Sequence, residues 1–435
     1  MKNKELLYRI PSKPQVTIPD SVDIPMAAEK ELSNGARIYV LPDAGRDVVR
    51  FSFVFRAGTS WQAVPFSASA TANTLSEGSK NMGAERIAEK LDFYGSYFDV
   101  NIDRDYSVVT FVCLARFFEK TIEVAREVLL NPVFPEREVR IYCEKSRERL
   151  IINRTKTDFL AREYFAAALY GENHPYGASS PASMYDALTP DDLRRFYSEH
   201  YTAASCFVVM SGDTTPERQK AVEELAMGLP EGEKVGREGF PVPKAEKFRY
   251  AEHPGAVQSS IRIGSIMFPR TDPDFIPMQV VTTLLGGYFG SRFIQNLREE
   301  HGYTYGAYSA MVNFDRSGYM AIATDVGGGF TEDAVRQIFH EMERLRTEMV
   351  PETELQLVKN IMAGEVMRIL DGPFGIADVT IENVQNGRDN GYLTEFTDRI
   401  KGFTPADVKL MAAKYLAPEN FTAVIVGCPG ARFEI

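Results

Sequence analysis

The chain has 435 residues, of which 44% are hydrophobic and 25% are charged, and its formal net charge is −11 at pH 7. A chain of this length exceeds one ordinary hydrophobic core and predicts two or more domains. The acidic balance and the absence of a Lys/Arg cluster argue against a nucleic-acid partner, because phosphate binding needs concentrated positive charge. No stretch approaches the roughly eighteen apolar residues of a membrane helix, so we expect no membrane partner.

The amino-terminal residues carry no apolar run of the kind that marks a secretory signal. We therefore expect a cytoplasmic protein, or a periplasmic one if the natural amino terminus lies further upstream. The four cysteines lie far apart and lack metal-ligand spacing, which favours reduced and mostly buried thiols over a disulfide framework.

The first elements of the chain read as an extended arm followed by a sheet with helices. Residues 1–27 contain several prolines among polar and β-branched residues, which predicts an extended arm. Residues 37–41 and 49–55 then read as antiparallel strands with one buried face. Apolar residues recur at helical spacing in 84–93 and 117–130, so we expect helices packed on the sheet.

A second copy of this pattern follows a linker. Residues 228–247 concentrate Gly, Pro and charge, which is typical of a linker. Before it, Leu-Thr-Pro-Asp-Asp-Leu at 188–193 precedes an apolar strand at 207–212. After it, Phe-Thr-Pro-Ala-Asp-Val at 403–408 precedes an apolar strand at 422–427. The constant offset of about 215 residues indicates duplicated domains.

Each half reads as strands, a helix, more strands, a long helical region and a final apolar strand. This order predicts an α+β fold in which each of two homologous lobes has a mainly antiparallel β-sheet with helices packed on one face. We expect the first lobe over 28–227 and the second over 248–435. Pro135 and Pro351 each stand where a long helical pattern begins.

A distinctive segment opens the second half. Residues 284–305 read Leu-Leu-Gly-Gly-Tyr-Phe-Gly-Ser-Arg-Phe-Ile-Gln-Asn-Leu-Arg-Glu-Glu-His-Gly-Tyr-Thr-Tyr. The glycine pair, the Ser-Arg step, Leu-Arg-Glu-Glu and the late Tyr resemble the second-lobe signature of the pitrilysin/insulinase-type zinc metallopeptidases, which include the mitochondrial processing peptidase. The resemblance spans roughly residues 28–435 and implies that the linker joins the lobes into a clamp.

The family's zinc motif, H-x-x-E-H on a helix ahead of a Gly-Thr step, is absent from the first half. With the Gly-Ser step at 78–79 placed on that Gly-Thr step, Ser69, Ala72 and Asn73 occupy the positions of the first His, the Glu and the second His. A zinc site needs about three imidazole, thiolate or carboxylate ligands and a base for the bound water. The resemblance therefore implies that this chain binds no zinc and no other cofactor.

Other residues offer no replacement site. Glu148 falls near the place of the family's distal zinc Glu, where it would stand without co-ligands. The five histidines are scattered along the sequence, and we expect surface or capping positions for them.

In catalytic members of the family, an Arg and a Tyr of the second lobe reach the zinc site of the first, and Arg298 and Tyr305 match them. A phenol and a guanidinium are donors that stabilise a developing oxyanion or hold a substrate carbonyl. The residues alone allow a plainer interpretation, in which Arg298 pairs with Glu299 or Glu300 in solvent and Tyr305 is a strand residue of the core. The intact signature favours a catalytic and substrate-binding role for both.

Two further segments have both a structural and a functional interpretation. The glycines at 286, 287 and 290 lack the Lys-Ser/Thr of a phosphate loop, so we expect close backbone packing there. Residues 94–101 resemble the edge strand that family members offer to an extended peptide, although without zinc this edge can also be purely structural.

Paired family members suggest the function. In paired bacterial homologues and in the mitochondrial enzyme, one subunit carries H-x-x-E-H and the other lacks it. The resemblance implies that this chain is the non-zinc-binding subunit of a heteromeric zinc-dependent peptidase, which binds unfolded peptide and supplies Arg298 and Tyr305 to the zinc site of a homologous H-x-x-E-H partner. One alternative is an inactive structural or peptide-binding homologue with a scaffold role. Another is a self-associating chain that binds peptides without cutting them.

Overall fold

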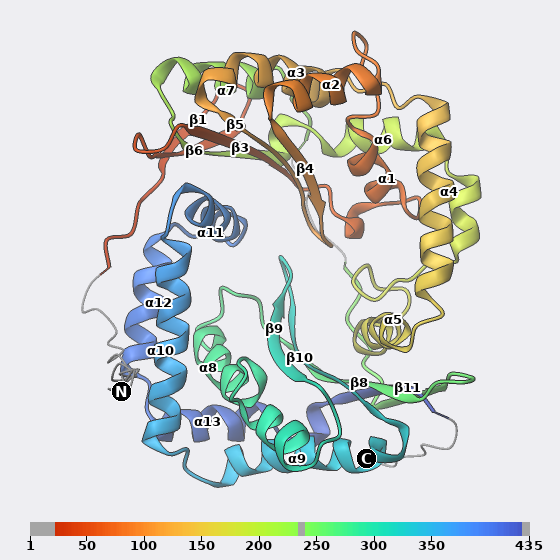
Figure 1. Cartoon of the computed structure of the whole chain (residues 1–435), viewed down its shortest axis with the longest axis vertical. Coiled ribbons are helices and arrows are strands. Elements are labelled where there is room, and N and C mark those ends of the chain that lie inside the picture. Colours follow the sequence, from red (N-terminus) through yellow and green to blue (C-terminus); the bar gives the residue numbers. More distant parts are fainter. Residues whose placement is uncertain (1–21, 234–239, 429–435) are drawn as a thin grey trace, which may run out of the picture.

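The computed structural model describes residues 22–233 and 240–428 and consists of two lobes that face each other (Figure 1). Most of the arm expected at 1–27 and the centre of the linker expected at 228–247 lie outside the described residues. The described flanks of that linker contain no helix or strand. Within the described ranges, no helix is long and apolar enough to cross a membrane.

Each lobe is built on one sheet. The first has the strand order β1-β2-β6-β3-β5-β4 and the second has the order β7-β11-β8-β10-β9. The strands of the first sheet are β1 (Ala28–Glu31), β2 (Arg37–Pro42), β3 (Val48–Phe55), β4 (Tyr97–Ile102), β5 (Ser107–Leu114) and β6 (Cys206–Gly212). The strands of the second sheet are β7 (Phe248–Glu252), β8 (Gln258–Met267), β9 (Ala307–Asn313), β10 (Gly318–Gly327) and β11 (Thr422–Gly427).

The two sheets have the same topology once β1 is set aside. In both, the last strand of the half lies beside the first in parallel, as β6 does with β2 and β11 with β7. The other strand pairs are antiparallel. The expected α+β fold with two homologous, mainly antiparallel lobes is therefore confirmed.

The helices lie mainly on the outer faces of the two sheets (Figure 1). In the first half they are α1 (Ser67–Thr74), α2 (Ala84–Tyr94), α3 (Phe118–Leu130), α4 (Glu136–Asn153), α5 (Thr157–Tyr170), α6 (Pro190–His200) and α7 (Pro216–Met227). In the second half they are α8 (Phe275–Gly286), a π-helical segment η5 (Ile294–Glu300), α9 (Thr331–Thr347), α10 (Glu352–Ile369), α11 (Pro373–Gln385), α12 (Gly391–Gly402) and α13 (Pro405–Tyr415). Short 3-10 helices are η1 (Thr59–Trp61), η2 (Ala115–Phe117), η3 (Ala182–Ala187), η4 (Ala203–Ser205), η6 (Gly328–Phe330) and η7 (Pro418–Asn420).

The repeated Thr-Pro sequences begin equivalent helices. Thr189 caps α6 and Thr404 caps α13, each with a proline at the first helical position. In both caps the threonine hydroxyl accepts a hydrogen bond from the backbone amide of an aspartate three residues later, and the carboxylate of that aspartate accepts one from the threonine amide. Such a capping box satisfies two amides that a helix start leaves unpaired. The sequence repeat therefore corresponds to a structural repeat.

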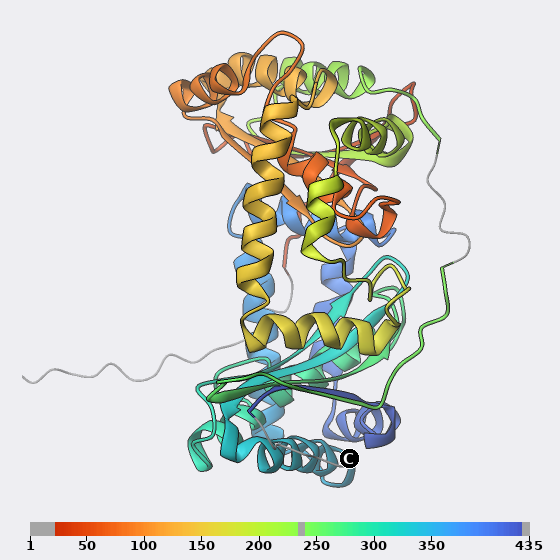
Figure 2. The ribbon, with the colours of Figure 1, turned by 90° about the vertical axis from the view of Figure 1, so that its right-hand side faces the viewer.

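Each half also sends one helix to the sheet of the other half. Helix α5 contacts β8 and β11 of the second sheet, and α11 contacts β2 and β6 of the first. Figure 2 shows α5 lying across the second sheet at the end of the long α4. Apolar side chains fill both contacts: Phe165 and Val424 belong to one buried cluster, and Ile376 and Val54 belong to another. The lobes are thus tied together by reciprocal packing.

This exchange of helices corrects the expectation that the first strands have only one buried face. Residues 37–41 and 49–55 run antiparallel as expected, with β6 inserted between β2 and β3. Strand β3 is buried on both faces, since Ser52 and Val54 lie in the interior along with Phe51 and Phe53. Alternation within one strand could not reveal that a helix from the other half covers its second face.

Candidate functional site

Helix α1 carries the three residues at the family's zinc-motif positions, and its donors are used within the helix. The Ser69 hydroxyl donates to the Phe66 carbonyl at 3.1 Å, and the Asn73 amide donates to the Ser69 carbonyl at 2.8 Å. Ala72 is 1% exposed and packs in the interior. A hydroxyl, a methyl and a carboxamide do not make a zinc site, so these residues do not fit the metal of the family.

No other part of the described ranges offers a metal site. No group of three His, Cys, Asp or Glu side chains there is arranged to hold an ion. Glu148 is an exposed residue of α4. Of the four cysteines, which are all free, Cys113, Cys143 and Cys206 are buried, as the sequence predicted.

Two histidines correct the expectation of surface positions. His174 and His200 are both buried. The His174 Nδ1 accepts a hydrogen bond from the Tyr176 amide at 3.0 Å. Burial lowers the pKa of both imidazoles, because a charged ring would lose its hydration there. Their aromatic neighbours, such as Tyr170 for His174, show that the rings serve the core.

Arg298 and Tyr305 lie on the surface of the second lobe. Arg298 belongs to η5, and its side chain is 34% exposed with its Nε 3.5 Å from Glu299 Oε1. The guanidinium carbon stands 4.5 Å from the ring centroid of Phe289. Tyr305 is 91% exposed and precedes β9. The pairing with Glu299 that the plainer interpretation predicted is present, but a core position for Tyr305 is wrong.

Phe289 also lies at the surface beside Arg298, and the sequence did not predict this position. Its side chain is 70% exposed, and that of Tyr308 on β9 is 65% exposed. The Phe289 ring lies against the Arg298 guanidinium, 4.5 Å from its carbon, so it contributes to the setting of that residue. No local sequence signal distinguished this residue, since Phe293 of the same segment is fully buried.

The rest of the signature holds this surface in place. The Arg292 guanidinium donates twice to Glu354, at 2.8 and 3.0 Å, and the Asn296 amide donates to Glu341 at 3.0 Å. A Cβ on Gly286 would lie 2.4 Å from the Ser309 amide nitrogen, so only glycine lets α8 approach β9 this closely. The expectation of close backbone packing is confirmed for Gly286.

The segment η5 has a π-helical bond, in which the His301 amide donates to the Asn296 carbonyl five residues earlier, at 3.1 Å. Such widened turns are frequent at functional sites because they change the direction of the side chains that follow. The signature therefore divides into an anchored set of residues, a half-buried Arg298 and an exposed Tyr305.

The predicted edge strand of the first lobe is β4, the last strand of its sheet. Its residues alternate between exposed and half-buried, beginning with the exposed Tyr97. A groove of about 500 Å³ lies beside it, lined by α2 and β4 residues that include Leu91, Tyr97 and Phe98. An edge strand with free backbone groups is able to add an extended peptide as a further strand.

The structure does not join the two sets of predicted residues. Ser69 and Asn73 belong to the first lobe, while Arg298 and Tyr305 belong to the second. No hydrogen bond or ion pair within the described ranges links one set to the other. The lobes meet elsewhere, where the Asp315 amide donates to Asp105 at 2.7 Å.

Comparison with known proteins agrees with the duplicated fold. A family model described as the peptidase M16 inactive domain matches residues 187–362. An uncharacterized zinc protease of Streptomyces coelicolor is 22% identical over 367 residues, which cover 81% of this chain and 78% of that protein. An uncharacterized zinc protease of Bacillus subtilis is 21% identical, over 68% of this chain and 72% of its own length. A non-peptidase homolog of Helicobacter pylori is 23% identical over 58% of each chain.

Solved structures share the whole architecture. The crystal structure of a peptidase M16 inactive domain from Pseudomonas fluorescens superposes with a TM-score of 0.87 at 22% identity, covering 94% of this chain and 100% of that one. A protease from Helicobacter pylori superposes with a TM-score of 0.81 at 16% identity, covering 93% and 100%. The chain therefore shares the two-lobe architecture of these proteins, and its residues 187–362 are similar to the inactive domain of the M16 peptidases.

Proposed function

We propose that this chain is the non-zinc-binding subunit of a heteromeric peptidase. It holds an unfolded peptide and supplies Arg298 and Tyr305 to the active site of a homologous partner that carries H-x-x-E-H and its zinc. The chemistry assigned to this chain is restricted to binding and hydrogen-bond donation. The attacking water and its activation belong to the partner.

The observation that carries the proposal is the exposure of Tyr305. Its side chain is 91% exposed, and within the described ranges its hydroxyl has no hydrogen-bond partner. A core tyrosine would be buried and bonded, since a buried phenol without a partner is unfavourable. A hydroxyl held in solvent beside β9 is available to donate to an oxyanion on a bound peptide.

The setting of Arg298 supports the same role. A guanidinium keeps its charge at any physiological pH, and its stacking on Phe289 reduces the number of rotamers that it populates. Among the residues that the structure describes, its single ion pair is with Glu299 and is long and largely solvated, so a substrate carbonyl or carboxylate competes with it at little cost. Arg298 is therefore held in position while its guanidinium remains available to a substrate.

Strand β4 supplies the second part of the proposal. Binding by strand addition uses main-chain groups, and so it accepts many sequences, while side-chain grooves add a modest preference. The groove beside β4, lined by Leu91 and Phe98, favours an apolar peptide side chain. This combination suits unfolded segments with little shared sequence.

The test is cleavage of an unstructured fluorogenic peptide by this chain, by a zinc-bearing homologue of similar length, and by their mixture. We expect activity in the mixture only. Because removing one oxyanion donor typically slows an enzyme by about 100-fold to 1,000-fold, Tyr305→Phe should lower kcat by this order with little change in peptide affinity. Arg298→Ala should act similarly and also raise KM.

Matched variants separate a catalytic from a structural effect. Arg140 is an exposed arginine of α4 with one weak carboxylate neighbour, Glu144, and Tyr164 is a half-buried tyrosine of α5. Arg140→Ala and Tyr164→Phe should leave the activity of the mixture unchanged. A mixture that is inactive, or that ignores changes at both Arg298 and Tyr305, would assign the chain to the scaffold class.

A further inference from the structure

The groove beside β4 offers a bound peptide more than a strand edge. It has a volume of about 500 Å³ and is lined by α2, by β4 and by the loop after α1. This volume lies within the range of ligand pockets, which span about 300 to 1,000 Å³. The lining includes the three carboxylates of Glu77, Glu85 and Asp92 and, among the described residues, no lysine or arginine. The groove is therefore acidic.

Most of the remaining lining is apolar. Ile87 and Leu91 of α2 are buried, and Phe98 of β4 is half-buried. Ala84 and Ala88 belong to the same lining, and their short side chains leave the groove open. An aliphatic chain is stabilised against such a surface because it leaves water.

The carboxylates of the groove lack a cation. Within residues 22–233 and 240–428, none of the three forms an ion pair. The two basic side chains of α2 pair with other carboxylates, Arg86 with Glu89 at 3.0 Å and Lys90 with Glu123 at 3.6 Å. The negative charge of the groove is thus not neutralised by its own helix.

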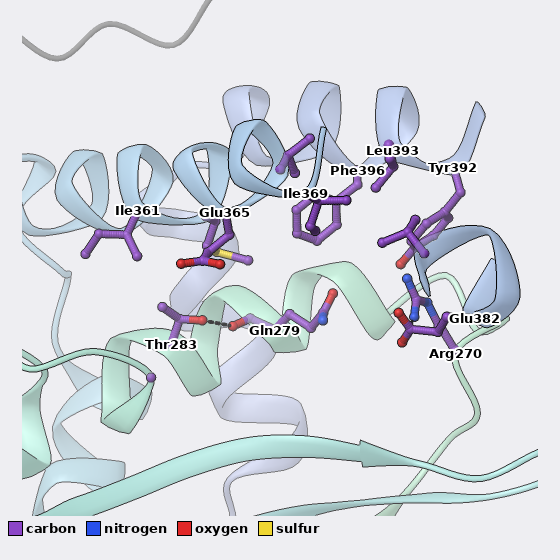
Figure 3. A pocket seen from close by; sticks show the side chains of 14 residues that line it. Arg270, Gln279, Thr283, Ile361, Glu365, Ile369, Glu382, Tyr392, Leu393 and Phe396 are labelled. Carbon is purple, nitrogen blue, oxygen red and sulfur yellow. Dashed lines mark hydrogen bonds and ion pairs between the residues drawn. The ribbon is translucent and has the colours of Figure 1, made fainter. Parts of the chain in front are cut away.

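A cavity of the second lobe differs in this respect. Helices α8, α10, α11 and α12 line a cavity of about 290 Å³ (Figure 3). Glu382 pairs there with Arg270, beside which Figure 3 shows it, and Glu365 pairs with Arg368 at 2.7 Å. Because these carboxylates already have cations, this cavity offers no comparable charge to a ligand.

Two of the three carboxylates of the groove stand where a cation would be stabilising. Burial raises the pKa of Glu77, and the nearby Glu138 carboxylate raises it further, while Lys145 acts in the opposite direction. Asp92 lies in the last turn of α2, which has no basic residue. The carboxyl end of a helix carries partial negative charge, so Asp92 adds to a charge that a cation would offset.

The geometry of strand addition brings one peptide side chain to this groove. Successive side chains of a strand point to opposite faces of its sheet. Phe98 marks the face of β4 that leads to the groove, since it packs against the core and also lines the groove. Lysine and arginine cover apolar surface with their aliphatic stems and keep the charged end at the rim.

We propose that this groove selects a lysine or arginine side chain of the unfolded peptide that binds along β4. The stem lies over Leu91 and Phe98, and the charged end pairs with the three carboxylates. An uncharged aliphatic side chain makes the same apolar contact but leaves the carboxylates unpaired. The inference rests on the proposed function and names its substrate class, unfolded segments with a basic residue.

The experiment is a fluorescence-anisotropy titration of the full chain alone with three labelled, unstructured peptides. They differ at one position, which holds lysine, norleucine or glutamate. We expect the lysine peptide to bind about fivefold to tenfold more tightly than the norleucine peptide, and the glutamate peptide to bind most weakly. The double variant Glu77→Gln, Asp92→Asn should bring the lysine and norleucine peptides to nearly equal affinity. Glu89→Gln changes a carboxylate of α2 outside the lining and should leave the preference intact.

A groove-filling variant tests the location. Ala88 is exposed on α2, and Ala88→Trp should abolish the lysine preference by closing the groove. If this variant fails to fold, the double charge variant decides the point. Equal binding of the lysine and norleucine peptides, or a preference that survives both changes, overturns the inference and leaves the cleavage role of Arg298 and Tyr305 standing. An inactive mixture in the cleavage test, with the lysine preference present, overturns that role instead.

Discussion

Replacement of Gly286 by alanine should destabilise the second lobe. This residue ends α8, where the helix approaches β9 most closely. An added Cβ would lie 2.4 Å from the Ser309 amide nitrogen and 2.8 Å from the Tyr308 carbonyl carbon. Both atoms belong to the backbone, so no side-chain rotation relieves the contact and the helix and the strand must separate.

The magnitude follows from two opposing terms. Overpacking of a filled interior costs about 1–3 kcal/mol, while alanine in place of glycine gains up to about 1 kcal/mol of helix propensity. The net loss in the free energy of unfolding should therefore be about 1–2 kcal/mol. Because β9 begins two residues after Tyr305, the same shift should also lower the activity of the proposed mixture.

The assay is urea unfolding followed by circular dichroism, with Gly364→Ala as the control. Gly364 lies in the interior of α10, is exposed, and its added Cβ would have no heavy atom within 4 Å. The same substitution there should stabilise the chain by about 0.5–1 kcal/mol. If Gly286→Ala were neutral or stabilising, the close packing of α8 on β9 could not be the reason for this glycine.

Three further predictions concern stability. Burial lowers the pKa of His200 below its usual 6.5, so His200 takes up a proton more readily in the unfolded chain than in the folded one. The free energy of unfolding should therefore fall as the pH drops below about 6.5. His200→Gln should flatten this part of the pH profile. Asp105→Asn should cost about 1.5–3 kcal/mol and loosen the contact between the lobes, because the Asp315 amide loses its charged acceptor; urea unfolding and small-angle scattering measure the two effects. Thr189→Ala and Thr404→Ala should each cost about 1 kcal/mol in thermal unfolding and add in the double variant, since the two caps lie in different lobes.

Local signals in the sequence predicted the elements well. The helical spacing at 84–93 and 117–130 corresponds to α2 and α3, whose ends lie within a residue or so of the predicted limits. The Thr-Pro caps and the constant offset predicted two equivalent lobes. Helical spacing and caps depend on contacts between residues close in sequence, so they can be recognised without the tertiary structure.

The candidate site was predictable only in part. The signature located Arg298 and Tyr305, and the lack of His and Glu at 69–73 predicted that this chain does not hold the family's zinc. The exposure of Tyr305 and its position beyond the core were not predictable, because a tyrosine before a strand is equally suited to burial. Phe289 was missed because its role depends on the place of a guanidinium nine residues later in the chain.

What the sequence determined by itself is therefore the duplicated α+β framework, the absence of a zinc motif and the identity of the signature. Only the tertiary structure decided that α5 and α11 cross to the opposite sheets and that β6 separates β2 from β3. The physical reason is the range of the interactions. Periodicity, caps and motifs report contacts within a few residues, whereas the burial of β3 on both faces depends on apolar side chains more than 300 positions away, such as Ile376, which shares a buried cluster with Val54.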